Sequence, residues 1–150
     1  MPNQNYRATN SVIRASNLLC PNLVIDQGIL MIGPKSFVNN KCLESVVMPS
    51  SLKSIAFGAF KNCSNLHEVI LNEGLTEIQD EAFENCLKLT SIVIPSSVCK
   101  VGNRAFFNCP NLKVVIFEGS DTVIGDDVFE RCEITSEEGS CFNDSIHMYS

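Results

Sequence analysis

Apolar residues recur along this chain with a period of 23 residues. The largest of them form one column, in which successive phenylalanines are 23 positions apart: Phe37, Phe60, Phe83, Phe106 and Phe129. Further columns run in the same phase: the cysteines Cys63, Cys86, Cys109 and Cys132; the leucines Leu43, Leu66, Leu89 and Leu112; and aliphatic columns that begin at Ile32, Val46 and Met48. Chance does not plausibly produce six columns in one phase, so the chain is an array of one repeated structural unit.

Each repeat contains one segment with the character of a β-strand. Leu43 to Met48 alternates in the period-2 manner of a strand and is rich in β-branched residues. The equivalent segments are Leu66 to Leu71, Leu89 to Ile94 and Leu112 to Phe117. Pro49 and Pro95 follow two of these segments and help to end them.

A return segment follows each predicted strand. In one of them Ile78, Ala82, Phe83 and Cys86 fall at i, i+4, i+5 and i+8, which predicts one or two helical turns with a single apolar face. Such a short helix is not stable alone, so packing on the next repeat has to hold it. The expected fold is an α/β repeat solenoid, with a parallel β-sheet on one face and short helical or irregular return segments on the other.

The repeat resembles the BspA-like leucine-rich repeats, the 23-residue class of Treponema pallidum type. The clearest match is Leu89 to Cys109, LTSIVIPSSVCKVGNRAFFNC, against the form L-x-x-I-x-I-P-x-S-V-x-x-I-G-x-x-A-F-x-x-C. The resemblance implies a solenoid of about five rungs over residues 20–134, with atypical first and last rungs. Residues 1–19 are then a polar N-terminal extension or cap, and residues 135–150 an acidic C-terminal cap or tail.

The charge of the chain narrows its partners. The formal net charge is −6, which argues against nucleic-acid binding because that needs clustered lysine and arginine. From Glu118 onward the chain has nine acidic residues and one basic residue, a net charge of −8, so the net charge of the rest of the chain is near +2. An acidic end usually serves solubility, and a docking face for a basic partner is the sharper alternative.

Two features of the sequence predict its cellular address. No apolar run is long enough to insert into a membrane, and residues 1–7 lack the apolar core of a secretory signal. As written the chain is expected in the cytoplasm. It would be at the cell surface or secreted if the sequence is a fragment or uses an unconventional route.

The cysteine column is expected to be a ladder of buried thiols in a narrow slot of the core. Stacked side chains point in parallel, which suits disulfides poorly, and ligands in a line do not form a tetrahedral metal site. Cys99 shares a column with Lys53 and Thr76, so it is expected near solvent and reactive. This cysteine usage fits a reducing compartment.

The asparagines that precede three ladder cysteines, Asn62, Asn85 and Asn108, are expected to bond between neighbouring turns through their side-chain amides. Catalysis finds no comparable pattern. His67 and His147 have no nucleophile or carboxylate partner at a recognisable spacing, and no glycine-rich phosphate loop exists. We therefore expect no enzyme activity, no catalytic residue, no metal site and no cofactor.

The outward side of the predicted sheet is the candidate binding surface. If Val46 and Met48 face the core, Val47 faces outward. Its column and the column beside it supply the predicted partner-binding residues: Val24, Glu44, Val47, His67, Ile70, Thr90, Val93, Lys113 and Ile116. Branched residues suit a strand on either face, so β-propensity alone is one explanation. An exposed apolar stripe with a polar rim is also typical of an interface.

Three functions follow from this surface. The first is a protein-interaction module that binds a protein partner, of unknown identity, through the sheet face. The second is a surface or secreted adhesin-like protein, because the resemblance implies relatives that adhere to host or extracellular proteins. The third is a structural repeat protein that associates with itself, either end to end or through its sheet.

Overall fold

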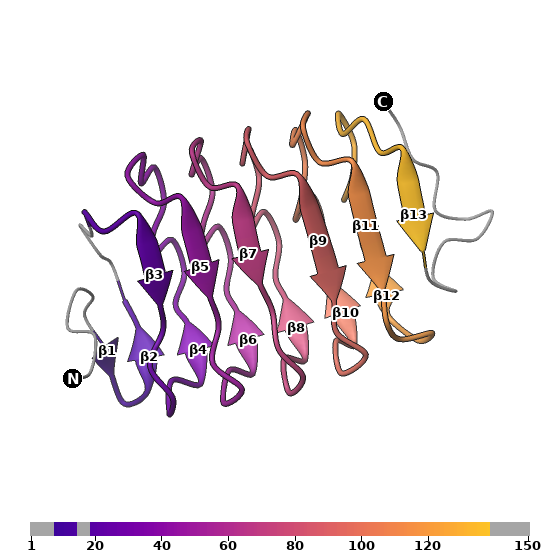
Figure 1. Cartoon of the computed structure of the whole chain (residues 1–150). Helices are drawn as coiled ribbons and strands as arrows, with labels where there is room; N and C mark the ends of the chain where they lie inside the picture. The colour runs from indigo at the N-terminus through magenta and orange to yellow at the C-terminus, as the bar shows by residue number, and fades with distance from the viewer. Residues whose placement is uncertain (1–7, 15–18, 139–150) are drawn as a thin grey trace.

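A parallel β-solenoid forms the described part of the chain, which in this computed structural model is residues 8–14 and 19–138. Two rows of short strands run along it from the N-terminal to the C-terminal end (Figure 1). The first row, here called the face sheet, contains β3 (Asn22–Val24), β5 (Ser45–Val47), β7 (Glu68–Ile70), β9 (Ser91–Ile94), β11 (Val114–Phe117) and β13 (Ser136–Glu138). The second row, the back sheet, contains β2 (Val12–Ile13), β4 (Met31–Ile32), β6 (Ser54–Ile55), β8 (Glu77–Ile78), β10 (Lys100–Val101) and β12 (Val123–Ile124).

The strand register reproduces the period of the sequence. In the face sheet Val46 pairs with Val69, and Ile92 pairs with Val115. In the back sheet Ile55 pairs with Ile78. Every one of these pairs joins residues 23 positions apart, so the predicted stacking of equivalent positions is confirmed. The face sheet is divided into two three-stranded sheets, between β7 and β9, whereas the back sheet is continuous from β2 to β12.

The back sheet was not expected from the sequence, which predicted a single sheet. The isoleucine column that begins at Ile32 was assigned to the return segments, and it lies instead in the strands of the back sheet. Each of these strands has only two residues. A period-2 alternation cannot be recognised over so short a length, because it needs at least two repeats of the pattern.

The prediction of helical return segments was wrong, since the described residues contain no α-helix. The backbone N–H groups of these segments alternate between two kinds of partner. Phe83 and Asn85 donate to Ala105 and Phe107 of the next rung at 2.7 and 2.9 Å, whereas Glu84 donates to Glu81 three residues earlier at 3.2 Å. A helix would keep every one of these donors within its own segment, so bonding to the neighbouring rung excludes it.

Left-handed residues enforce the same conformation. Glu81 and Asn85 have φ of 58° and 62°, and both columns repeat this value in neighbouring rungs, as at Arg104 (56°) and Asn108 (56°). Asparagine tolerates this region better than other non-glycine residues. Two tight turns in succession therefore place Ala82, Phe83 and Cys86 on the inner side, which is the burial that the helical pattern imitated.

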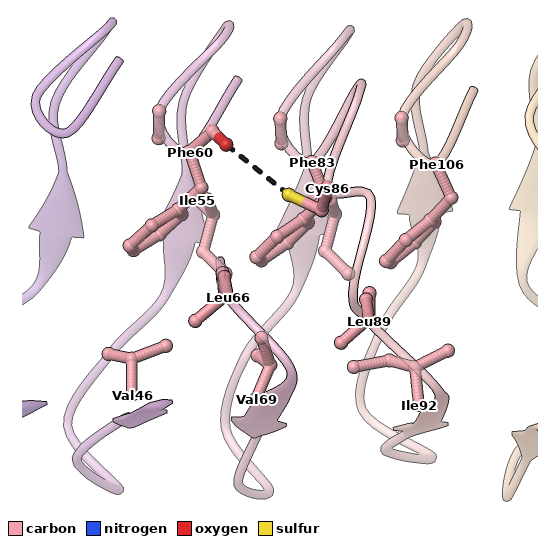
Figure 2. Close-up of a cluster of buried hydrophobic side chains, with 14 of the residues drawn as sticks. Val46, Ile55, Phe60, Leu66, Val69, Phe83, Cys86, Leu89, Ile92 and Phe106 are labelled. Atoms are coloured by element: carbon pink, nitrogen blue, oxygen red, sulfur yellow. Dashed lines mark hydrogen bonds between the residues drawn. The ribbon is translucent and has the colours of Figure 1, made fainter. Parts of the chain in front are cut away.

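The core is a set of side-chain columns that run the length of the solenoid. Phe37, Phe60, Phe83 and Phe106 are fully buried, and their rings stack with centroids 5.1–5.2 Å apart and planes within 6° of parallel. Figure 2 shows three of these rings, Phe60, Phe83 and Phe106, in line above the column of Leu66 and Leu89 and the column of Val46, Val69 and Ile92. The small residues Ser36, Ala59, Ala82 and Ala105 are also buried, which lets the turns approach the core closely.

Buried polar groups are paired along the same axis. The thiol of Cys86 donates to the carbonyl oxygen of Phe60 at 3.4 Å, the dashed line in Figure 2. The other ladder thiols bond in the same way, and the predicted ladder of buried cysteines is confirmed. The predicted amide ladder is confirmed as well, since Asn108 donates to Asn85 and Asn85 to Asn62 at 2.9 and 2.7 Å.

Much of the two predicted end segments lies outside the described residues, as does Cys141. Within the described part, β1 (Ala8–Thr9) pairs antiparallel with β2 and closes the N-terminal end of the back sheet. Ile13 of β2 is fully buried and belongs to the core. The domain boundaries at residues 19 and 134 stay predictions.

Replacement of Phe83 by alanine is expected to lower the free energy of unfolding by about 3–5 kcal/mol, because it leaves a ring-sized cavity in the middle of the stack. Urea denaturation followed by circular dichroism measures the change. Phe57→Ala is the control, since Phe57 is 37% exposed and its loss is expected to cost less than about 1 kcal/mol. Equal losses in the two variants would contradict the stacked core.

Candidate functional site: the outer side of the face sheet

The apolar column on the outer side of the face sheet consists of Val24, Val47, Ile70, Val93 and Ile116. Val24 is 61% exposed, Ile70 42% and Val93 43%, whereas Val47 and Ile116 are half-buried. Their neighbours in the same strands, such as Leu23, Val46 and Ile92, are buried in the core. The parallel pairing places Val24 beside Val47 and Val47 beside Ile70, and likewise Val93 beside Ile116.

A more polar column lies near it, at the residue that immediately precedes each of the strands β5 to β11. Glu44, His67 and Thr90 are exposed, and Lys113 is half-buried. Lys113 bonds to a carboxylate oxygen of Glu133 at 2.9 Å and to the carbonyl oxygen of Pro110 at 3.3 Å. All nine residues predicted for partner binding therefore have side chains that solvent reaches, and each lies in a strand of the face sheet or immediately before one.

The back sheet offers an internal comparison for the apolar column. The residues of its strands that alternate with the inward column are Val12, Met31, Ser54, Glu77, Lys100 and Val123. Three of these six are polar, although the backbone is the same parallel β-structure. The other outward column of the face sheet is itself mainly polar, as at Ser45, Glu68 and Ser91. Beta propensity acts on all these positions equally, so it does not explain why one outward column is branched and apolar in all five strands from β3 to β11.

One acidic side chain, Glu73, connects two successive turns that follow the face-sheet strands. The carboxylate of Glu73 accepts hydrogen bonds from the backbone N–H and hydroxyl of Ser96 at 2.9 and 2.8 Å, and from the N–H of Ser97 at 3.2 Å. The bonds from Ser96 hold the pKa of Glu73 below its ordinary value. This contact links the turn after β7 to the turn after β9.

Glu84 is a buried charged residue that the sequence pattern does not reveal. Glu84 is 5% exposed and lies in the turns between the back sheet and the face sheet. One of its oxygens is 3.1 Å from a guanidinium nitrogen of Arg104, and the other is 3.8 Å from the ammonium of Lys61. The hydrogen bond that Arg104 donates to Glu84 raises the pKa of Arg104. The guanidinium of Arg104 also lies 3.8 Å from the ring centroid of Phe107.

Glu84 and its two cationic partners lie on three successive rungs, so they bind those rungs together. The available signal was a pair of opposite charges 20 positions apart, at Lys61 and Glu81 and again at Glu84 and Arg104. That spacing differs from the period of 23, so these ion pairs join residues that are not equivalent in the repeat, and the repeat pattern does not predict them.

A shallow polar groove of about 290 Å³ follows the asparagine ladder. Its lining is Asn39, Lys41, Asn62, Ser64, Asn85, Leu87 and Asn108. The amides of the ladder bond to one another, with Asn62 donating to Asn39 at 2.8 Å. The groove is therefore mainly a consequence of the ladder that holds the turns in register.

Chemically reactive groups do not converge within the described ranges, residues 8–14 and 19–138. No group of three or more histidine, cysteine or acidic residues there could hold a metal ion. No helix in this part of the chain is long and apolar enough to cross a membrane.

The ladder thiols are buried, whereas the described cysteines outside the ladder are exposed or half-buried. Burial raises the pKa of the Cys63 thiol from 9.0 to about 12, and burial also raises the pKa of Cys86 and Cys109. Cys42 and Cys99 are exposed, as predicted for Cys99. All seven cysteines of the described residues are free thiols.

This architecture is that of a leucine-rich-repeat solenoid, and its repeats define the family. The model of the BspA type leucine rich repeat region matches residues 30–150 with six copies. The chain therefore belongs to the BspA-type leucine-rich-repeat family, as its sequence pattern predicted. Solenoids of this kind are typically non-enzymatic interaction scaffolds. No curated protein matches the chain.

Solved structures share the same fold. The leucine rich repeat protein of T. pallidum, TpLRR, has a TM-score of 0.80 at 24% identity, covering 93% of this chain and 81% of that one. A leucine rich cell surface protein of Faecalibacterium prausnitzii has a TM-score of 0.77 at 28% identity, covering 95% and 41%. The pneumococcal vaccine antigen PcpA has a TM-score of 0.66 at 19% identity, covering 91% of this chain and 38% of that one. This chain thus spans less than half of the last two proteins.

Alkylation of the native protein with iodoacetamide at pH 9 is expected to modify Cys42 and Cys99 and to spare Cys63, Cys86 and Cys109. These three thiols stay protonated in the folded protein because burial raises the pKa of each, that of Cys63 from 9.0 to about 12. Peptide mapping by mass spectrometry reads the sites, and the protein unfolded in urea is the control in which all cysteines react. Rapid native modification of Cys86 would contradict the buried ladder.

Proposed function

We propose that this chain is a protein-binding module whose contact surface is the outer side of the face sheet. Leucine-rich-repeat proteins generally mediate interactions between proteins. The observation that carries the proposal is the contrast between the two sheets. The apolar column supplies a branched apolar side chain at one outward position of each face-sheet strand from β3 to β11, whereas Ser54, Glu77 and Lys100 occupy the middle of the back sheet.

The energetics favour the same surface. The apolar column lies on a rigid platform, because every strand beneath it has a buried partner column and in-register backbone bonds. Binding there would order few additional groups, which reduces the entropic cost of association. The flanking residues Glu44, His67, Thr90 and Lys113 supply the polar rim that is typical of an interface.

An adhesin-like role is the second candidate, and one comparison favours it. The relative from Faecalibacterium prausnitzii is described as a cell surface protein and is 28% identical. The free thiols of the described residues favour the cytoplasmic alternative, because a reducing compartment keeps cysteines unpaired. The same face sheet would serve either role, so the location of the partner distinguishes them.

The variant Ile70→Glu/Val93→Glu is expected to fold normally and to lose partner binding, because two carboxylates in the centre of the apolar column would have to be desolvated on contact. Affinity capture with the purified protein as bait, followed by quantitative mass spectrometry, measures the loss. Cytoplasmic extract and extracellular protein fractions are tested separately, so the fraction that contains the partner also separates the two roles.

The matched control is Ser54→Glu/Val123→Glu, which adds the same two carboxylates to outward positions of the back sheet. It is expected to capture the same proteins as the wild type. Circular dichroism and urea denaturation of both variants establish that they are folded. If the face-sheet variant captured the same proteins as its control, the face sheet would not be the binding surface.

A further inference from the structure

The polar column beside the apolar column changes sign along the solenoid. It reads Glu44, His67, Thr90 and Lys113 from β5 to β11, with a negative charge at one end and a positive charge at the other. The apolar column does not change in character over the same strands. A reversal of the solenoid direction would therefore exchange the charges and leave the apolar column unaltered.

We propose that the face sheet binds a second copy of this chain, face to face, about a two-fold axis that runs parallel to the strands and passes between β7 and β9. This inference rests on the proposed function and names the occupant of that surface. The axis places Ile70 opposite Val93 of the second copy and Val47 opposite its Ile116. It also places Glu44 opposite Lys113 of the second copy, and symmetry makes that pair twice.

The charges select this arrangement over the other face-to-face two-fold. An axis parallel to the solenoid would set each rung against the same rung of the second copy, with the strands antiparallel. Glu44 would then lie opposite Ser50, and Lys113 opposite Gly119, so neither charge would find a partner. In the proposed arrangement no residue of the two columns lies opposite a like charge, which is the complementarity expected of a specific contact.

Lys113 can exchange its ion-pair partner, Glu133, for Glu44 of the second copy. Its ammonium is paired with Glu133 at 2.9 Å, but the side chain of Glu133 is 67% exposed and that of Lys113 is 37% exposed. An ion pair so open to water contributes little to the stability of the monomer. The lysine can therefore turn to a carboxylate of the second copy without leaving a buried charge behind.

The size of the surface predicts a reversible dimer. With strands about 4.8 Å apart, the five members of the apolar column extend over roughly 20 Å. A column that is roughly 20 Å long and only one residue wide covers less than the ~800 Å² that each partner usually contributes to a stable complex. We therefore expect dimers whose proportion rises with protein concentration rather than a permanent assembly.

Sedimentation velocity over a range of concentrations tests the proposal. The wild type is expected to shift from monomer to dimer as concentration rises, and Ile70→Glu is expected to remain monomeric. Glu44→Lys and Lys113→Glu are each expected to weaken their own homodimer about tenfold, because each variant sets two like charges against each other. An equimolar mixture of these two variants is expected to restore dimers, since both ion pairs form in the mixed dimer, one with the original polarity and one with reversed polarity.

The back sheet provides the matched control. Glu77→Lys and Lys100→Glu carry the same changes in net charge on β8 and β10, so their mixture tests whether opposite overall charge alone causes association. It is expected to behave as the wild type does. All variants change outward residues, and circular dichroism with urea denaturation shows that each is folded.

Three results would overturn the inference. These are a wild type that stays monomeric at every concentration, a dimer that Ile70→Glu does not affect, or a mixture of Glu44→Lys and Lys113→Glu that gives no more dimer than its components. None of these results decides the proposed function. Affinity capture, run with dilute bait that is monomeric, reports separately whether the face sheet binds another protein.

Discussion

Registered stacking of one rung on the next is the interaction on which the whole structure depends. No rung buries its own apolar side chains, so each relies on the equivalent residues 23 positions away. The phenylalanine rings stack at 5.1–5.7 Å, and the backbone N–H groups of the turns bond to the neighbouring rung. Because both kinds of contact repeat with the same period, a shift in register would break them together.

The same constraint explains why polar residues also form columns. A side chain that both accepts from one neighbouring rung and donates to the other can repeat through the stack, as in the chain of amides from Asn108 to Asn39. The thiol of Cys86 meets the carbonyl oxygen of Phe60 in the same geometry as the thiol of Cys109 meets that of Phe83. Buried polar groups thus reinforce the register that the apolar columns establish.

Only positions that face outward are released from this constraint, so their composition carries information about binding. The outer positions of the back sheet vary between Met31, Ser54 and Lys100, as solvent-exposed positions commonly do. In the face sheet, by contrast, the column from Val24 to Ile116 stays branched and apolar, beside an outward column that is mainly polar, as at Ser45, Glu68 and Ser91. The two sheets share one backbone architecture, and they differ in what they offer to another molecule.

The sequence by itself determined the period, the face-sheet strands, the buried cysteines and the asparagine ladder, because each is a property that equivalent residues share and repeat. It led to a wrong helix at Ala82 to Cys86, because helical spacing and two successive tight turns bury the same residues. Only the tertiary structure decided that the backbone bonds of the turns go to the next rung, that Ile55 and Ile78 form a second sheet, and that Glu84 is buried between Lys61 and Arg104. These features depend on which neighbour a group meets across rungs, and a pattern along one chain does not contain that information.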